Sequence, residues 1–467
     1  MTILKLSVLA VSLLLHILWA LLIPPYQGND EERHFATVLF FSEEKRFISK
    51  QDQGLGFRDS SWYKQLRAEI IRHESHRVFA NPLYHRDYTE DQNLSSEIED
   101  INVSPGYPYQ PGYYLFASIA GSTFSSLQAK LYAARFVSIV FSMLTVYFVY
   151  KIIRHVTKQE FLSIIGTALV AFFPIMTYAG SMVNNDSIVG FSATWCVYLL
   201  LTIQKNQTPR NVLLLSFGIA LGLMSKPQFI PIGVATIGVA LYLIYTQNDY
   251  WKERLKSALQ LFSVSAILAL PWYIFNLFQF GSFFPETFKP GVGISGMVEK
   301  SGIRPEGIHN IVYLGKSVIM RWFSHLPPRF AGDFGQVDIQ APAYANTLFQ
   351  IGFILFFIGG LFLLVRYLLR KRKLRFYHLV FLIITLSLEG LYTFLWIRGI
   401  WRNGGATFPL FARYYFPLSS IGAYVVMKVI SLGSSFRYFA YILLSISVSM
   451  LAYNFYCILL VITKYYL

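Results

Sequence analysis

The chain has 467 residues, of which 54% are hydrophobic, 17% are aromatic and only 14% are charged. Soluble globular proteins carry about 25% charged residues, so this composition excludes a secreted single domain, a disordered chain, a coiled coil and a disulfide-stapled fold. It indicates an all-α integral membrane protein that crosses the bilayer several times.

The net charge of +15 comes from basic residues in short clusters between apolar stretches. Cytoplasmic loops of membrane proteins carry such an excess of lysine and arginine, so the charge does not indicate a nucleic-acid partner. Cys196 and Cys457 lie in apolar stretches and have no metal-type spacing.

A membrane-spanning helix needs about 20 mostly apolar residues. By this measure the sequence predicts about eleven transmembrane helices in a single polytopic domain over residues 1–467. They lie near residues 3–25, 131–153, 160–180, 187–204, 211–225, 228–246, 257–279, 344–368, 376–397, 412–432 and 438–463. We expect the first to remain as a membrane anchor, because WALLIPPYQG follows it without a small-residue cleavage site.

The positions of lysine and arginine predict the orientation. With a cytoplasmic N-terminus, every connection on the inside is short and basic, including the run RYLLRKRKLR at 366–375. We therefore expect a plasma-membrane (inner-membrane) protein whose segments 26–130 and 280–343 form extracytoplasmic loops. The short segment WIRGIWRNGGATFPLFARYY lies on the same side.

The first extracytoplasmic loop has a composition of its own, with 15 of the 25 acidic residues between Asp30 and Asp100. Apolar residues at helical spacing in 30–48 and 61–76 predict amphipathic helices along the membrane surface. Residues 110–125 are apolar but short, and they predict an interfacial or re-entrant helix. A full span there would turn every later basic cluster outward.

Acidic residues gather where the first span ends at Pro24 and Pro25. The segment GNDEERHF brings Asp30, Glu31 and His34 to the outer face of the membrane. In a helix, Asp30 and His34 share one face, and a carboxylate there can accept a proton from an acceptor hydroxyl. The alternative is structural: Asn29 followed by Glu32 fits a helix capping box.

The order of several motifs resembles that of GT-C membrane glycosyltransferases, in particular protein O-mannosyltransferases and aminoarabinose-lipid A transferases. D-E-x-x-H-F follows a proline-ended first span, and YQPGYY precedes the next. AARFVSIVFSML, YAGSMVNNDS, LGLMSKPQFIPI, PWYIFNLFQFGSFF and FARYYFP follow in the same layout. The resemblance covers most of the chain and fits a bacterial branch of this superfamily.

The resemblance implies an inverting transferase of cell-envelope polysaccharide biosynthesis. The donor would be a sugar on a polyprenyl phosphate, and the acceptor would be a surface glycan, a lipid or a protein. Asp30 matches the aspartate that acts as general base, with Glu31 beside it. His34 matches a common position of the family, where it orients or simply packs. The family pattern implies neither a metal ion nor another cofactor for such a donor.

The leaving polyprenyl phosphate needs cations near the membrane surface, and arginine and lysine can provide them. Lys226 and Arg413 stand at predicted outer ends of spans, although a snorkelling lysine and an arginine anchored among aromatic side chains are the alternatives. Arg135, Arg321 and Arg402 are further candidates of the same kind.

Three more residues are candidates for lining the cavity. Asp186 lies between spans three and four in the polar run Asn184–Asp186, which also fits a tight outside turn. Glu389 lies well inside the ninth span, where a carboxylate costs about 2.5–3.5 kcal/mol and faces a cavity or a partner. Tyr113 is an aromatic residue that could stack on a sugar, although anchoring in the headgroup region explains it as well.

Two other functions fit the composition. A transporter or flippase for a lipid-linked glycan would use Glu389, but the halves show no internal repeat and the carboxylates cluster in one loop. A scaffold without catalytic activity in a polysaccharide assembly would retain Asp30 only as a helix cap.

Overall fold

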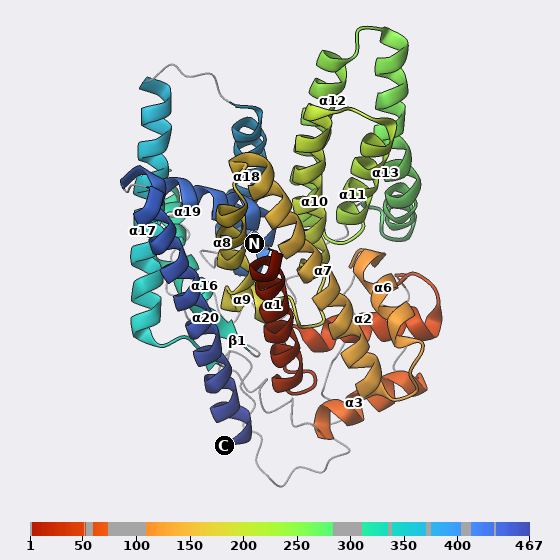
Figure 1. Ribbon diagram of the computed structural model, residues 1–467. Coiled ribbons are helices and arrows are strands. Elements are labelled where there is room, and N and C mark those ends of the chain that lie inside the picture. Colours follow the sequence, from red (N-terminus) through yellow and green to blue (C-terminus); the bar gives the residue numbers. More distant parts are fainter. Residues whose placement is uncertain are drawn as a thin grey trace.

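The computed structural model describes residues 2–50, 52, 59–72, 109–283, 311–334, 339–369, 375–402, 412–433 and 436–467. Within these ranges the chain is almost entirely helical (Figure 1). The only strands described there are β1 (Asp333–Phe334) and β2 (Ile339–Gln340), which pair antiparallel. The predicted all-α class is therefore confirmed.

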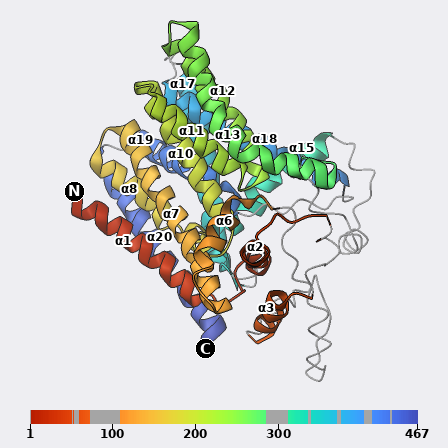
Figure 2. The same ribbon diagram turned by 90° about the vertical axis from the view of Figure 1, so that its right-hand side faces the viewer.

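In the described residues of the N-terminal part, three short helices stand between two long ones. They are α1 (Thr2–Leu22), α2 (Glu31–Glu44), α3 (Ser61–Arg72), α6 (Pro111–Gly121) and α7 (Leu127–Thr157). The helices expected in the first extracytoplasmic loop are thus present as α2, α3 and α6. Figure 2 shows α2 and α3 below α6 and outside the bundle of long helices.

The middle part consists of helices that run back and forth between the two ends of the bundle. They are α8 (Glu160–Ala171), α9 (Pro174–Ala179), α10 (Asp186–Lys205), α11 (Pro209–Leu223), the 3-10 turn η3 (Pro227–Phe229), α12 (Ile230–Gln247) and α13 (Trp251–Phe280). The prediction of a single helix over 160–180 is wrong. Pro174 lacks an N–H for a preceding carbonyl and begins α9 instead, so the segment breaks in two.

The C-terminal part begins with short helices and ends in four longer ones. They are α15 (Ile311–Met320), the π-helical turn η5 (Arg321–His325), α16 (Leu326–Gly332), α17 (Ala343–Leu369), α18 (Phe376–Arg402), the 3-10 segment η6 (Ala412–Leu418), α19 (Ser419–Gly433) and α20 (Phe436–Tyr466). The segment expected as one span over 412–432 begins as η6, which carries Pro417, and continues as α19.

Seven helices in the described part of the chain are long and apolar enough to cross a membrane, and three shorter apolar helices accompany them. The multi-pass architecture is confirmed, whereas the number of eleven spans and the bounds of the two outer loops stay predictions.

Helix α10 occupies the centre of the bundle and fixes the place of the site. It packs against α7, α11 and η6, and 83% of its apolar stretch is buried. Its side chains belong to the same hydrophobic cluster as those of α11, α12 and α18. The first residue of α10 therefore lies where α7, α11 and η6 converge.

Candidate active site

The chain turns sharply between α1 and α2. Tyr26 and Asp30 have positive φ angles of 65° and 56°, a left-handed conformation that is costly for tyrosine and more easily adopted by aspartate. Asp30 is the N-cap residue of α2, but its side chain makes no capping hydrogen bond. Helix α2 begins one residue later than a capping box of Asn29 and Glu32 would require, so that alternative is wrong.

The Asp30 carboxylate instead pairs with an arginine nearly 400 residues away in the chain. Nη2 of Arg413 in η6 donates to Oδ2 of Asp30 over 2.6 Å. The Arg413 side chain is 5% exposed, whereas that of Asp30 is 39% exposed. Burial alone would raise the pKa of Asp30, but Arg413, with smaller contributions from His34 and Arg33, lowers it below its ordinary value. Asp30 is therefore ionised at neutral pH.

A second carboxylate holds the same arginine. Nε of Arg413 lies 3.1 Å from Oδ2 of Asp186, and Nζ of Lys226 donates to Oδ1 of Asp186 over 2.5 Å. The ammonium group of Lys226 also lies over the ring of Tyr414, 4.3 Å from its centroid. Asp30, Asp186, Lys226 and Arg413 thus form one ion cluster with two negative and two positive charges.

The turn before α10 places Asp186 in this cluster. Oδ1 of Asn184 accepts from the backbone N–H groups of Asp186 and Ser187, at 2.9 and 3.3 Å, and so satisfies the start of the helix. The side chain of Asn185 donates to the carbonyl of Ser225, which immediately precedes Lys226. The predicted tight turn and the predicted cavity position of Asp186 are therefore compatible features of one segment.

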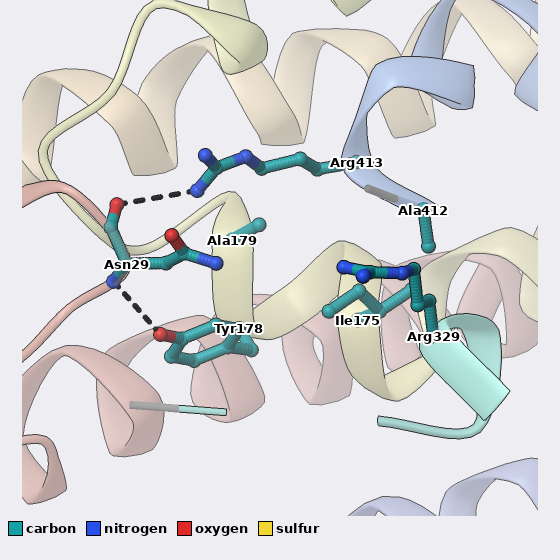
Figure 3. A pocket seen from close by; sticks show the side chains of 7 residues that line it. All are labelled: Asn29, Ile175, Tyr178, Ala179, Arg329, Ala412 and Arg413. Carbon is teal, nitrogen blue, oxygen red and sulfur yellow. Dashed lines mark hydrogen bonds between the residues drawn. The ribbon is translucent and has the colours of Figure 1, made fainter. Parts of the chain in front are cut away.

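A small pocket adjoins the ion cluster (Figure 3). The N–H of Asn29 donates to the Tyr178 hydroxyl over 3.1 Å, and Nη1 of Arg413 donates to the carbonyl of Asn29 over 3.2 Å. Arg329, from α16, extends its guanidinium group towards Asn29 in the same direction as Arg413. The lining residues are Asn29, Ile175, Tyr178, Ala179, Arg329, Ala412 and Arg413.

Glu31, next to Asp30, has an entirely different environment. It forms a fully buried, two-point ion pair with Arg135 of α7, at 2.8 and 2.5 Å. Its carboxylate also accepts from the N–H groups of Gly28 and Val183. Arg135 donates in addition to the carbonyls that end α1, those of Ala20, Ile23 and Pro24. These two predicted site residues thus hold each other and the end of α1.

His34 is buried among tyrosines. Its Nδ1 is 2.6 Å from the hydroxyl of Tyr114, and its ring stacks on that of Tyr109 with the centroids 4.9 Å apart. Burial lowers the pKa of His34 to about 3, so the imidazole is neutral at physiological pH. Tyr113 is also buried, and its hydroxyl lies against α7, 3.0 Å from the carbonyl of Ala134 and 2.7 Å from Oγ of Ser138.

Arg321 and Glu389 form a second ion pair that is separate from the cluster. Nη2 of Arg321 donates to Oε2 of Glu389 over 3.0 Å and lies 3.3 Å from the hydroxyl of Thr393. The pair joins η5 to α18. Arg402 is the last residue of α18, and its side chain lies outside the described residues.

Four of the predicted site residues therefore meet in the ion cluster, and Arg329 joins them at the pocket without having been predicted. Arg329 stands in LPPRFAG within the expected second outer loop, where nothing in the local sequence separates it from other arginines. In the described ranges no three His, Cys, Asp or Glu side chains gather as a metal site would require. The cluster combines an ionised carboxylate with cations that can receive an anion.

Solved structures of one archaeal enzyme share this fold. The oligosaccharyltransferase of Archaeoglobus fulgidus, crystallised with zinc and sulfate, superposes with a TM-score of 0.51 at 15% identity, covering 97% of this chain and 52% of the enzyme. Its apo form gives 0.48 at 14% identity, covering 97% and 55%. The chain thus spans about half the length of these enzymes. The resemblance to GT-C membrane glycosyltransferases is confirmed at the level of the fold.

Comparison at the sequence level identifies a family. No curated protein matches the sequence significantly. The model of one family, described as "Predicted membrane protein (DUF2142)", matches residues 13–422 and therefore includes the second half of α1, the ion cluster and the pocket. The chain belongs to this DUF2142 family of membrane proteins.

Proposed function

We propose that the protein is a GT-C-type membrane glycosyltransferase. It moves a sugar from a polyprenyl-phosphate donor to a glycan, lipid or protein acceptor at the extracytoplasmic face of the plasma membrane. The shared fold supports the class of enzyme, and the motif order supports the lipid-phosphate donor. The observation that carries the proposal is the ion cluster, in which the partly exposed Asp30 pairs with Arg413, and Lys226 joins the cluster through Asp186.

The proposed step is a single displacement. The oxygen of an acceptor hydroxyl attacks the anomeric carbon, and the bond between this carbon and the phosphate oxygen breaks. Asp30 takes the hydroxyl proton, and polyprenyl phosphate leaves with the bonding electron pair. Arg413 and Lys226 neutralise the charge that develops on the phosphate. Attack opposite the leaving group inverts the anomeric configuration.

Several other predicted site residues do not take part in the proposed step but hold the groups that do. We assign Glu31 and Arg135 to holding the α1–α2 turn, because they bind each other and Arg135 also binds carbonyls at the end of α1 and just after it. Asp186 is a positioning residue that holds Lys226 and Arg413 on the same side of the site. Glu389, which a transporter would need, is engaged by Arg321, and this favours a structural role.

The test compares surface glycans and lipid-linked sugars by mass spectrometry in a deletion strain and in complemented strains. The Asp30→Asn strain is expected to lack the same sugar as the deletion strain and to accumulate the polyprenyl-phosphate sugar, although the variant protein reaches the membrane normally. Asp59→Asn is the matched control, because this carboxylate is fully exposed on the same loop. The proposal would be contradicted if the Asp30→Asn strain made wild-type glycans while the deletion strain only failed to export an intact glycan.

A further inference from the structure

Arg413 faces two different environments. Its guanidinium nitrogens contact Asp30, Asp186 and the carbonyl of Asn29, and the same side chain lines the pocket that Arg329 enters from α16. Two arginine side chains directed into one small pocket are a binding arrangement for an oxyanion, because each guanidinium can present parallel N–H donors. Nothing in the motif order assigns Arg329 to any role.

We infer that the pocket between Arg329 and Arg413 binds the phosphate group of a polyprenyl lipid, and that this phosphate competes with Asp30 for Arg413. An empty pocket leaves Arg413 paired with Asp30. A phosphate in the pocket draws Arg413 away and exposes the carboxylate to the acceptor. The inference rests on the proposed function for the identity of the lipid and for treating Asp30 as the base.

The contacts indicate which bond of Arg413 gives way. Its three nitrogens carry five N–H groups and already contact the carbonyl of Asn29, Asp30 and Asp186, so a phosphate that draws the guanidinium further into the pocket must lengthen at least one of these contacts. Asp186 is 4% exposed and is also held by Lys226, so it cannot move without leaving a buried charge unpaired. The Asp30 side chain is 39% exposed and can turn into water, so its bond is the one that yields.

The charges favour the exchange. The ion cluster holds two carboxylates and two cations, and the side chains of Arg329 and Arg413 both line the pocket. A phosphate entering the pocket meets both guanidinium groups, and its own charge repels the Asp30 carboxylate. The charged or titratable groups around Asp30 are Arg33 and His34 on α2, Tyr109 just before α6, Tyr114 on α6, Arg413 on η6, Asp186 on α10 and Lys226 beyond α11. Of these, only Arg413 also lines the pocket.

The consequence for catalysis is an order of binding. Without the donor, Arg413 holds the pKa of Asp30 low, and a carboxylate in that state is a weak proton acceptor. With the donor phosphate in place the pKa rises, so the base becomes effective only when there is a sugar to transfer. The donor should therefore bind productively before the acceptor.

The experiment measures Asp30 directly rather than sugar transfer. The full-length protein in nanodiscs is labelled with a carbodiimide and a small amine from pH 3 to 7, and the Asp30 peptide is quantified by mass spectrometry. The reagent attacks the protonated carboxyl, so the midpoint of the pH profile reports the pKa, while shielding by a ligand changes only the amplitude. Separate samples contain no addition, polyprenyl phosphate, polyprenol of the same length, or inorganic phosphate.

Polyprenyl phosphate is expected to raise the Asp30 midpoint by about one to three pH units, and polyprenol is expected to leave it unchanged. A shift with inorganic phosphate as well shows that the phosphate group alone suffices, and a shift with the lipid only shows that the chain contributes. Arg329→Gln should abolish the shift, and Arg72→Gln, an exposed arginine on α3, should retain it. The fully exposed Asp59 serves as the internal reference.

Several results would overturn the inference: an unmoved or lowered midpoint with polyprenyl phosphate, an equal shift with polyprenol, or an undiminished shift in Arg329→Gln. Its failure can be told from failure of the proposed function. If the midpoint stays fixed while Asp30→Asn abolishes transfer, the proposed function stands, but the phosphate does not compete with Asp30 for Arg413. If the midpoint moves while Asp30→Asn still transfers sugar, the phosphate pocket stands and Asp30 is not the base.

Discussion

Asp30 and Glu31 are adjacent carboxylates with opposite surroundings. The left-handed backbone at Asp30 turns its side chain towards η6, where it is partly exposed and has one arginine. Glu31, one residue later, points into the protein and meets Arg135 with no exposure on either side chain. A carboxylate that must reach a substrate needs the first environment, and one that holds segments together needs the second.

This contrast predicts different effects of mutation. Glu31→Gln should destabilise the protein by about 3–5 kcal/mol, because it leaves the Arg135 guanidinium buried without its counter-charge. Asp30→Asn should change stability much less, because its carboxylate is partly exposed. Thermal unfolding of the purified variants in detergent would show the difference, and equal losses in stability would contradict the assigned roles. A double-mutant cycle with Arg135→Gln should show strong coupling.

His34 predicts a pH dependence of stability. Burial lowers its pKa from 6.5 to about 3, so the unfolded chain binds a proton between these values and the folded chain does not. Stability therefore falls as the pH drops below 6.5, by about 2 kcal/mol at pH 5 from this residue alone. His34→Gln should lose less stability than the wild type between pH 7 and pH 5 in thermal unfolding. An equal loss would mean that His34 titrates normally.

At the residue scale, the sequence pointed to four side chains that meet in the ion cluster, but it did not predict their partners. Asp30, Asp186, Lys226 and Arg413 could be named because they stand in motifs at the predicted outer ends of spans. Glu31 and Arg135 were named for their charge as well, but their pairing depends on a contact across 104 positions that no local pattern encodes. Arg329 has no local signal and needs the fold.

At the scale of elements, the site depends on close backbone approach. The N–H of Gly112 in α6 donates to the carbonyl of Met224 over 2.7 Å, directly before the segment that carries Lys226. A Cβ at this position would lie 2.8 Å from that carbonyl oxygen and from Oγ of Ser225. Only glycine allows α6 to dock here without moving the segment.

Gly112→Ala should therefore displace the segment that carries Lys226 and raise KM for the lipid donor, with a loss of about 1–3 kcal/mol in stability. Gly238→Ala is the matched control, because an added Cβ there meets nothing within 4 Å. Donor titrations of both variants in a transfer assay test this expectation. An unchanged KM in Gly112→Ala would show that the position of α6 does not matter for the donor.

The break between α8 and α9 shows why hydropathy alone predicted one helix over 160–180. A hydropathy window averages across Pro174, whereas the backbone cannot. The break turns α9 towards the site, where Ile175, Tyr178 and Ala179 line the pocket. The proline was visible in the sequence, and it marks the place where a spanning segment becomes part of a binding site.

At the scale of the whole molecule, the connection between α12 and α13 lies at the top of the view in Figure 1, and α2 and α3 lie in its lower half. The orientation expected from lysine and arginine stays a prediction. Composition and hydropathy sufficed for the architecture, because a long apolar helix has few alternatives in a membrane. They could not predict the register between helices, which depends on interlocking side chains distant in the sequence.

The orientation can be tested with thiol labelling, since Cys196 and Cys457 are both fully buried and give little background. Lys64→Cys on α3 should react with an impermeant maleimide in sealed cells. Lys252→Cys at the start of α13 should react only after permeabilisation. Both wild-type lysines are exposed. The reverse pattern would place the ion cluster in the cytoplasm and exclude the proposed extracytoplasmic reaction.

Arg135 binds the last carbonyls of α1 and also Glu31 at the start of α2, from a fixed place on α7. Transmembrane helices respond to thinner or thicker bilayers by tilting, and a tilt of α1 alone would carry the α1–α2 turn with it. Because one guanidinium binds both sides of that turn from α7, the three helices must tilt as a unit. The protein should therefore keep its geometry across membranes of different lipid chain length, and this tolerance should disappear when Arg135 is replaced.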